Sequence, residues 1–208
     1  MLKKFIQFGF FLLYNHLAFI YDWVAWSVSL GQWSNWRQTS LQFLKPGPTL
    51  ELAYGTGSLF TTMTLNGLHP TGVDLSPFMA RIAANRLRRQ QLPLSIARSK
   101  AQALPFPTGY FGNALATFPS NYLFEAETLA EIHRALAEGG QLIVVMQGQL
   151  KGPAWPSAFI EWLYRITGQR EFVRVKLLSR FNEAGFRAQW QQTSFEGAVA
   201  HLIVAQKM

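Results

Sequence analysis

The sequence predicts an α/β protein with a doubly wound, mostly parallel seven-stranded sheet, an antiparallel last strand and additional N-terminal helices. Short apolar segments of strand length alternate with segments of helix length between residues 49 and 145. A glycine-rich turn follows the first of these strands, and the last two predicted strands are consecutive. Strands that alternate with helices form parallel sheets with right-handed crossovers, whereas two consecutive strands indicate an antiparallel hairpin.

Each predicted element has a local signal in the chain. The strands are expected at residues 49–53, 71–75, 94–98, 113–118, 140–145, 186–192 and 198–205. The helices that follow the first strand are expected at residues 58–66, 77–89, 125–137, 155–167 and 174–184. Ser76 is a favourable N-cap, Pro77 suits the first helical position, and Gly185 is expected to end the helix before it.

The first 45 residues are predicted to form a helical cap on a domain that spans residues 46–208 and carries a helical insertion at about 150–182. Basic residues precede an apolar segment here, but no small-residue cleavage site follows, so we expect no signal peptide. Polar residues such as Gln7 and Asp22 interrupt the segment, which disfavours a membrane span. Two helices that cover the core or lie at a membrane interface fit better, and the tryptophans nearby suit either arrangement.

The composition excludes several kinds of site. The absence of cysteine excludes disulfides, thiolate nucleophiles and Cys-ligated metals, and the four scattered histidines predict no metal site. The net charge of +8 is compatible with nucleic acid, an anionic membrane or an anionic substrate. The basic residues form two separate clusters and no continuous stripe, which disfavours a nucleic-acid partner. We expect a cytoplasmic protein, in which the aromatic N-terminal helices pack on the core or, as the alternative, make peripheral contact with a membrane.

The turn at residues 54–57 has the features of a nucleotide-type site. Its glycines let a ligand approach the backbone, and the following helix offers unpaired N–H groups. A dinucleotide site requires a small residue where Phe60 stands. Asp74, at the end of the second strand, can accept hydrogen bonds from the ribose of either ligand. Glu51 suits the α-ammonium group of S-adenosylmethionine and would repel a pyrophosphate, so these residues favour the methyl donor.

Several motifs occur in order along the chain. They are Leu50-Glu51-Leu52-Ala53-Tyr54-Gly55-Thr56-Gly57, Gly72-Val73-Asp74-Leu75-Ser76-Pro77-Phe78-Met79, Ala101-Gln102-Ala103-Leu104-Pro105-Phe106-Pro107 and Ala116-Thr117-Phe118-Pro119. Residues 129–136 and Gly139-Gly140 then lead into the fifth strand. Together they resemble the class I S-adenosylmethionine-dependent methyltransferases, in the branch similar to the quinone-biosynthesis C-methyltransferases. The resemblance covers about residues 48–146 and implies an enzyme with S-adenosylmethionine as its cofactor.

The resemblance also implies where the cofactor lies, with its methionine part at the turn, its ribose on Asp74 and its adenine between two loops. The cofactor-binding residues that it implies are Tyr21, Glu51, Ala53, Tyr54, Gly55, Gly57, Asp74, Leu75, Met79, Lys100, Ala101, Gln102, Thr117 and Phe118. Of these, Leu75 and Met79 are expected to flank the adenine. His16, Ser120 and Tyr122 are the candidates for contact with the methyl acceptor. No catalytic residue is assigned, because alignment with a strongly electrophilic sulfonium supplies most of the acceleration.

Three positions depart from the family pattern. Ala53 replaces the usual first glycine, and we expect a mild effect because alanine is small. Lys100 stands where many relatives have an aspartate that accepts from the adenine amino group, and lysine is only a donor. The Gln102 carbonyl or a backbone oxygen is expected to take its place. Gly112 replaces a common aspartate that is usually structural.

The function that these observations predict is methyl transfer to a small, apolar or lipid-like acceptor under a roof of residues 1–36 and 150–182. Two alternatives remain open. The Lys100 and Gly112 departures are compatible with a weakened methyltransferase fold that binds a membrane surface or a protein partner. The positive net charge is compatible with methylation of RNA.

Overall fold

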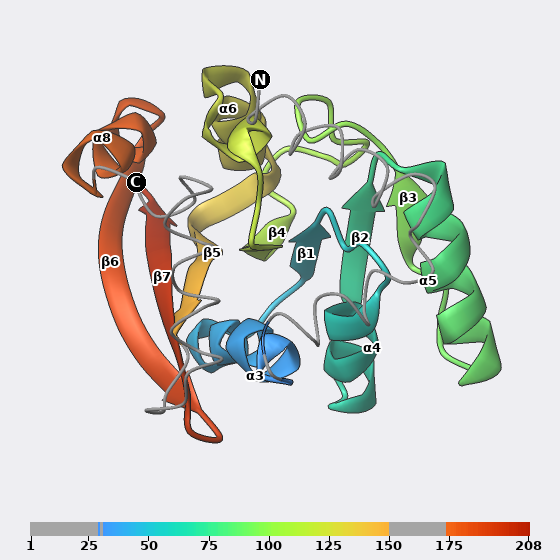
Figure 1. Cartoon of the computed structure of the whole chain (residues 1–208). Coiled ribbons are helices and arrows are strands. Elements are labelled where there is room, and N and C mark those ends of the chain that lie inside the picture. The colour runs from blue at the N-terminus through green and yellow to red at the C-terminus, as the bar shows by residue number, and fades with distance from the viewer. Residues whose placement is uncertain (1–28, 30, 150–173) are drawn as a thin grey trace, which may run out of the picture.

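The computed structural model describes Ser29 and residues 31–149 and 174–208 (Figure 1). Within these ranges seven strands form one sheet in the order β3-β2-β1-β4-β5-β7-β6. Their bounds are β1 Thr49–Leu52, β2 Pro70–Asp74, β3 Ile96–Arg98, β4 Phe111–Thr117, β5 Leu136–Gln149, β6 Phe186–Phe195 and β7 Ala198–Lys207. Strands β1 to β5 pair in parallel, and β7 is antiparallel to both β5 and β6. The predicted doubly wound sheet with a reversed last strand is therefore confirmed.

The strand order reverses between β1 and β4, which fixes where a ligand can lie. The chain moves outward from β1 to β3 and then returns to the other side of β1 to form β4. Leu52 lies opposite both Val73 and Ala116, so the carboxyl ends of β1, β2 and β4 meet at one edge. Open α/β sheets bind ligands in the crevice outside this edge, at the reversal point.

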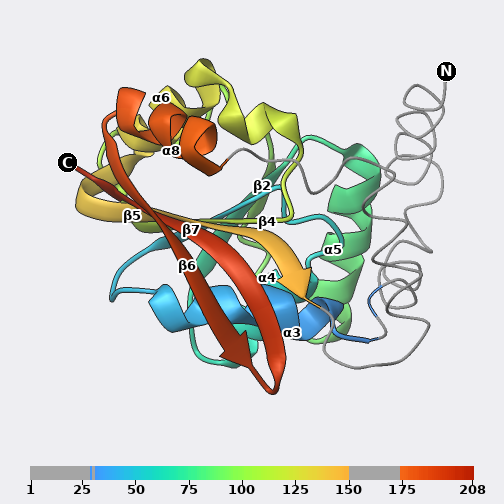
Figure 2. The ribbon, with the colours of Figure 1, turned by 60° about the vertical axis from the view of Figure 1, so that its left-hand side comes forward.

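Helices cover both faces of the sheet. The described helices are α3 Trp33–Gln38, η2 Thr39–Phe43, α4 Ser58–Leu65, α5 Pro77–Arg89, η3 Asn121–Phe124, α6 Ala126–Ala135 and α8 Arg174–Glu183. Figure 2 shows α6 and α8 on one face, with α3 and α4 on the other. Two buried clusters correspond to these layers: Phe181 and Ile132 belong to the first, and Trp36 and Met63 to the second.

The sequence signals for α5 are confirmed in detail. The helix spans the predicted residues, Ser76 is its N-cap, and the Ser76 hydroxyl accepts a hydrogen bond from Met79 N at 3.3 Å. Pro77 occupies the first helical position, where it has no N–H to leave unsatisfied. This cap anchors the loop between β2 and α5, which carries part of the predicted site.

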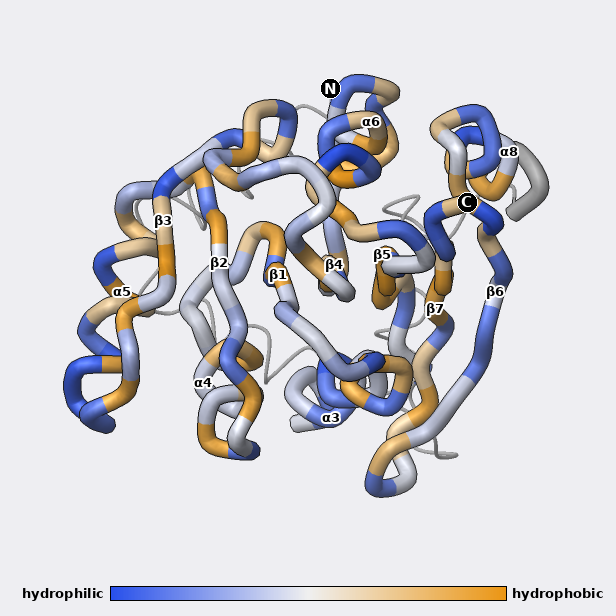
Figure 3. Tube along the Cα trace, turned by 180° about the vertical axis from the view of Figure 1, so that it is seen from behind, coloured by the Kyte–Doolittle hydropathy of each residue, from blue (hydrophilic) through white to orange (hydrophobic). Residues whose placement is uncertain are grey.

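The strand boundaries differ most at β5, β6 and β7. Strand β5 begins at Leu136 instead of residue 140 because Leu136 pairs with Phe111 of β4, so the helix before it ends at Ala135. Strand β5 continues to Gln149 because its polar end pairs with β7, as Gln149 does with Val199. Figure 3 shows that the edge strand β6 is hydrophilic along most of its length. Such polarity protects an exposed edge from pairing with another chain.

The predicted N-terminal cap and helical insertion are described only in part. The helices α3 and η2 belong to the cap, and α8 belongs to the insertion, whereas residues 1–28 and 150–173 lie outside the described residues. The division into a cap and a main domain stays a prediction. Within the described ranges, none of the helices has the length and apolar character that a membrane crossing requires.

Candidate functional site

The turn between β1 and α4 requires glycine at Gly57. This residue has a φ of +72° and is the N-cap of α4 without a side-chain cap. A Cβ atom on Gly57 would lie 2.8 Å from the Cβ atom of Ala83 on α5, which is closer than real contacts allow. The close approach of α4 to α5 therefore depends on this glycine, and the first N–H groups of α4 face the carboxyl edge of the sheet.

Ala53 is strained, although the sequence predicts a mild effect. Its φ is +51°, in the left-handed region that favours glycine. Alanine there costs about 1–2 kcal/mol, so the small size of the side chain is not the decisive property. The prediction of a mild effect considered only the volume of the side chain, and the backbone conformation adds this cost to it.

Asp74 at the end of β2 faces the same turn. Its Oδ2 accepts from Gly55 N and its Oδ1 accepts from Ser76 N, both at 2.8 Å. Burial raises the pKa of Asp74, and hydrogen bonds from the backbone N–H groups of Ser76, Gly55 and Leu75 oppose the rise. Each carboxylate oxygen has a second acceptor site, so the group retains the capacity to accept from two hydroxyl groups.

Glu51 is a buried carboxyl group in the middle of β1. It is 2% exposed, and its Oε2 has no hydrogen-bond partner in the part of the chain that the structure describes. Burial raises the pKa of Glu51 to about 8; the charge of Arg37 lowers it and the charge of Asp74 raises it. Buried polar atoms are almost always paired, so this oxygen fits a ligand that brings a donor. A primary ammonium group is such a donor.

Arg37 on α3 is a residue that the sequence analysis missed. It is 9% exposed, and its Nη2 donates to Ser58 Oγ at 3.1 Å, where α4 begins after the turn. Its charge acts on Glu51 across the same turn. No local pattern distinguishes this arginine from the others, because its placement depends on how α3 packs against α4.

Tyr54 contributes its backbone to the turn and its side chain to the core. Its carbonyl accepts from Gly57 N at 2.9 Å, which closes the turn. The ring is buried against Gly72, where an added Cβ would lie 2.8 Å from the ring. Burial and the charges of Asp74 and Glu51 raise the pKa of the Tyr54 phenol to about 12, so it stays protonated at neutral pH.

The predicted adenine residues lie in two segments that contact each other, the stretch from Leu75 to Met79 in the first turn of α5 and the loop after β3. Leu75 is 54% exposed and offers an apolar surface at the edge of the sheet, whereas Met79 is completely buried and has no surface open to a ligand. Lys100 is exposed, and Ala101 and Gln102 are half-buried. Leu75 is therefore available for a stacking contact, whereas Met79 offers no exposed surface for the predicted one.

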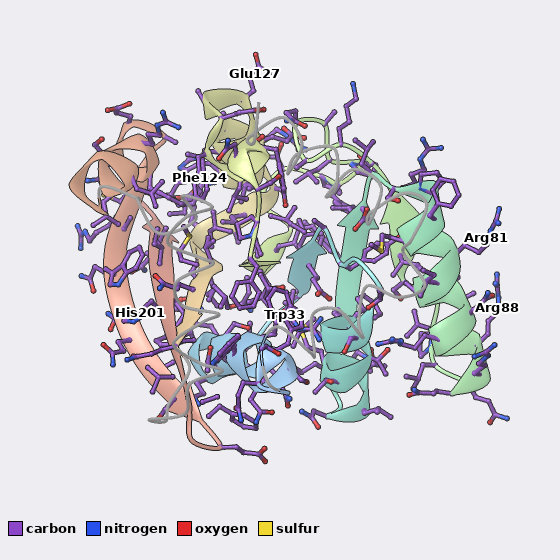
Figure 4. All side chains as sticks on the ribbon, in the orientation of Figure 1. Trp33, Arg81, Arg88, Phe124, Glu127 and His201 are labelled. Atoms are coloured by element: carbon purple, nitrogen blue, oxygen red, sulfur yellow. The ribbon has the colours of Figure 1, made fainter. Side chains whose placement is uncertain are left out.

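The end of β4 carries the residues predicted to face the reacting centre. Phe118 has a φ of +49°, which is rare for a bulky residue and typical of functional sites. The Phe118 ring stacks on Trp33 of α3, with the ring centroids 4.2 Å apart, and the Trp36 ring contacts Phe118 edge-on. Trp33 is labelled on α3 in Figure 4. Thr117 and Tyr122 are half-buried, and Ser120 is exposed. Tyr21 and His16, also predicted, lie outside the described residues.

The structure thus brings Glu51, Asp74 and the glycine turn together at one edge of the sheet. A separate cavity of about 650 Å³ lies between α6 and α8. Among the residues that the structure describes, none that lines this cavity is a predicted cofactor or acceptor residue. In the described ranges no three histidine, aspartate or glutamate side chains gather in a group that could hold a metal ion.

Comparison with protein families and curated proteins agrees with this geometry. Residues 50–144 match a family model described as a methyltransferase domain. The chain is 30% identical to the demethylmenaquinone methyltransferase of Thermus thermophilus over 164 residues, which cover 76% of this chain and 72% of that protein. It is 31% identical to the enzyme of the same name from Tropheryma whipplei, covering 64% of this chain but only 56% of that protein. It is 25% identical to the ubiquinone/menaquinone biosynthesis C-methyltransferase of Rhizobium johnstonii, covering 88% and 80%.

Solved structures share the fold at low sequence identity. An S-adenosylmethionine-dependent methyltransferase from Thermotoga maritima, described as a possible histamine N-methyltransferase, has a TM-score of 0.61 at 21% identity, covering 91% of this chain and 96% of that one. The geranyl diphosphate C-methyltransferase of Streptomyces coelicolor, solved with S-adenosyl-L-homocysteine, has a TM-score of 0.61 at 13% identity, covering 82% and 77%.

Proposed function

The chain belongs to the class I S-adenosylmethionine-dependent methyltransferases, and from that premise we propose that it methylates a small apolar acceptor of the quinone-precursor class. The enzyme uses S-adenosylmethionine as its methyl donor. The identity of the acceptor and the roles of individual residues are the proposed part. Relatives named for demethylmenaquinone and for ubiquinone or menaquinone biosynthesis support the choice of acceptor class.

The observation that carries the cofactor assignment is the buried, unpartnered Oε2 of Glu51 beside the glycine turn. In our proposal this carboxylate pairs with the α-ammonium group of the methionine part. Arg37 adds a positive charge on the other side of the turn, which helps to keep Glu51 ionised when the ammonium is present. The N–H groups at the start of α4 complete the polar environment of the amino-acid end.

The proposed positions of the ribose and the base of the cofactor follow from the position of Asp74. Its two oxygens accept from Gly55 N and Ser76 N, which fixes the carboxylate, and in our proposal the remaining acceptor sites of these oxygens take the two ribose hydroxyls. A base attached to that ribose then lies over the exposed side chain of Leu75. This direction places the sulfonium end toward β1 and β4.

The chemistry requires little from the protein beyond alignment. The bound donor supplies a methyl group on a positively charged sulfur, which is already a strong electrophile. The protein therefore contributes by holding the acceptor in line with that bond and by excluding water. Thr117 and Phe118, at the end of β4, are the described residues that we assign to the border between donor and acceptor.

In our proposal the methyl acceptor binds beside the end of β4, and the described residues on this side are aromatic. Trp33, Trp36 and Phe118 form one cluster at the end of β4, between α3 and the sheet. Offset and edge-on aromatic contacts suit a flat apolar ring. His16 and residues 150–173, which complete the predicted roof, lie outside the described residues, as do the N-terminal helices predicted to touch a membrane.

One observation keeps RNA methylation as a second candidate. Arg81, Arg88 and Arg89 are exposed on α5, and Figure 4 shows Arg81 and Arg88 pointing away from the sheet. A nucleic acid on this face would bind with strong salt dependence. Filter binding of a structured RNA at low and at moderate salt tests it, and no binding at low salt would remove it.

Titration calorimetry and a methyl-transfer assay test the proposed function in two steps. We expect S-adenosyl-L-homocysteine to bind the protein, and radiolabelled S-adenosylmethionine to transfer its methyl group to a short-chain demethylmenaquinone. Histamine and a structured RNA serve as comparison acceptors. Failure to bind S-adenosyl-L-homocysteine would contradict the cofactor assignment, whereas binding with transfer only to a comparison acceptor would contradict the acceptor class.

A further inference from the structure

The loop after β3 lies directly against the residues that we assign to the ribose and the base. Ser99 N donates to Asp74 O at 3.1 Å, and Arg98 Nε donates to Leu75 O at 3.0 Å. A base whose ribose lies on Asp74 therefore lies between Leu75 and residues 99–102. The amino group of adenine is a hydrogen-bond donor, so at this edge it is best matched by an acceptor.

The Lys100 side chain cannot be that acceptor, and two nearby backbone oxygens already accept one hydrogen bond each. A lysine ammonium has three donors and no acceptor. The carbonyl of Lys100 already accepts from Ala103 N at 3.2 Å. The single proton of the Ser99 hydroxyl goes to the Ala103 carbonyl at 2.7 Å, the shorter of its two contacts, with the Lys100 carbonyl at 3.1 Å. Each of the two carbonyls therefore already has one donor inside the loop.

Gln102 offers a side-chain carbonyl whose orientation is fixed. Its Nε2 donates to Glu125 Oε2 at 2.8 Å, across from the loop after β3 to the start of α6. Only the nitrogen of the amide can donate to a carboxylate, so this contact decides which end faces Glu125 and turns Oε1 away from it.

The side chain of Glu125 makes this contact with Gln102 and does not cap its own helix. It is the N-cap residue of α6, yet no side-chain cap bond is formed there. The Gln102–Glu125 hydrogen bond is solvent-exposed, so it contributes little to stability. Its main physical effect is to favour one orientation of the Gln102 amide, whose backbone belongs to the loop that contacts Asp74 and Leu75.

We propose that Gln102 Oε1 accepts the hydrogen bond of the adenine amino group in place of the aspartate that Lys100 replaces, and that Glu125 is the positioning residue that orients the Gln102 amide. The proposal rests on the proposed function, since it requires the adenosine of the cofactor to lie at this edge. It makes base recognition in this chain depend on two elements, the loop after β3 and the start of α6.

The test compares S-adenosyl-L-homocysteine with its 6-deamino analogue, in which purine replaces adenine, by titration calorimetry. The wild-type protein is expected to prefer S-adenosyl-L-homocysteine by about three- to tenfold, the effect of one hydrogen bond. The Gln102→Met variant keeps the length of the side chain without its acceptor. It should bind the two ligands equally, with the affinity for the analogue unchanged.

Glu125→Gln is expected to reduce the preference by about two- to threefold, because its amide can pair with Gln102 in either orientation. Glu127→Gln is the matched control, since Glu127 is exposed on the same helix and points away from the protein (Figure 4). It should leave both affinities unchanged. Lys100→Asp added to Gln102→Met should restore the preference by supplying an acceptor at the family position.

The outcomes separate this inference from the proposed function. Absence of binding of either ligand to the wild-type protein would overturn the cofactor site itself. Equal binding of both ligands by the wild-type protein would overturn only the assignment of an acceptor for the amino group. A wild-type preference that persists in Gln102→Met would show that another group accepts this hydrogen bond.

Discussion

Replacement of Glu51 by glutamine should weaken cofactor binding and stabilise the fold at the same time. The Glu51 carboxyl group is buried, and its pKa is raised to about 8 from an ordinary value of 4.5. Glu51→Gln removes the negative charge but keeps the volume and one oxygen acceptor. A hydrogen bond between charged groups is worth about 1.5–3 kcal/mol, so the affinity for S-adenosyl-L-homocysteine should fall by about 10- to 100-fold.

The stability change follows from the same pKa. In the unfolded chain the carboxyl group ionises near pH 4.5, whereas in the free folded protein it stays mostly protonated up to about pH 8. The unfolded state therefore binds fewer protons in this window, and wild-type stability falls as pH rises through it. At pH 7 the cost is at most about 3 kcal/mol, and Glu51→Gln should recover most of it.

Two assays measure these effects. Urea denaturation at pH 5, 7 and 8.5 should show a growing stability advantage of Glu51→Gln over the wild-type protein. Calorimetry at pH 7 in phosphate and in Tris should show release of close to one proton when the wild-type protein binds S-adenosyl-L-homocysteine, and none for the variant. Equal affinities for the two proteins, or binding without proton release, would refute the role of Glu51. Glu127→Gln is the control for removal of a carboxylate.

Three further changes test the geometry of the turn and the loop beside it. Ala53→Gly should raise the free energy of unfolding by about 0.5–1 kcal/mol, because relief of the strain at φ +51° exceeds the added freedom of the unfolded chain; urea denaturation measures it. Gly57→Ala should lower the free energy of unfolding by about 1–3 kcal/mol, because the new Cβ would meet the Cβ of Ala83. The same urea denaturation measures this loss, and an unchanged free energy of unfolding would contradict the requirement for glycine. Arg134→Met should lower the free energy of unfolding by about 1–2 kcal/mol and increase hydrogen exchange at the amides of Leu104, Phe106 and Thr108, since Arg134 donates to Glu131 and to the carbonyls of Leu104 and Phe106. Unchanged exchange would contradict this role.

Most of the fold can be predicted from the lengths and spacing of the apolar segments and from the residues that begin and end helices. The alternation of strand and helix lengths predicts the parallel sheet, and Ser76-Pro77 predicts the start of α5 at the correct residue. The long β5 could not be predicted, because its ends are defined by pairing with Phe111 and Val199, which are distant in sequence.

The residues of the candidate site can be predicted only where a short stretch of sequence, such as a strand and the turn after it, determines their position. Glu51, Asp74 and Gly57 are found from their positions relative to the first two strands, and the structure brings them together. The left-handed conformation of Ala53 and the complete burial of Met79 depend on how the turn and α5 pack. Arg37 reaches the site from α3, outside the matched methyltransferase domain, so no motif could have indicated it.

A crystal structure of the full chain with S-adenosyl-L-homocysteine is the most direct test of the central claim, that the cofactor lies across the carboxyl edge of the sheet. We expect the amino nitrogen of the ligand within hydrogen-bond distance of Glu51, both ribose hydroxyls on Asp74 and the base over Leu75. A ligand bound elsewhere, or bound here with its amino group away from Glu51 and its ribose away from Asp74, would contradict it.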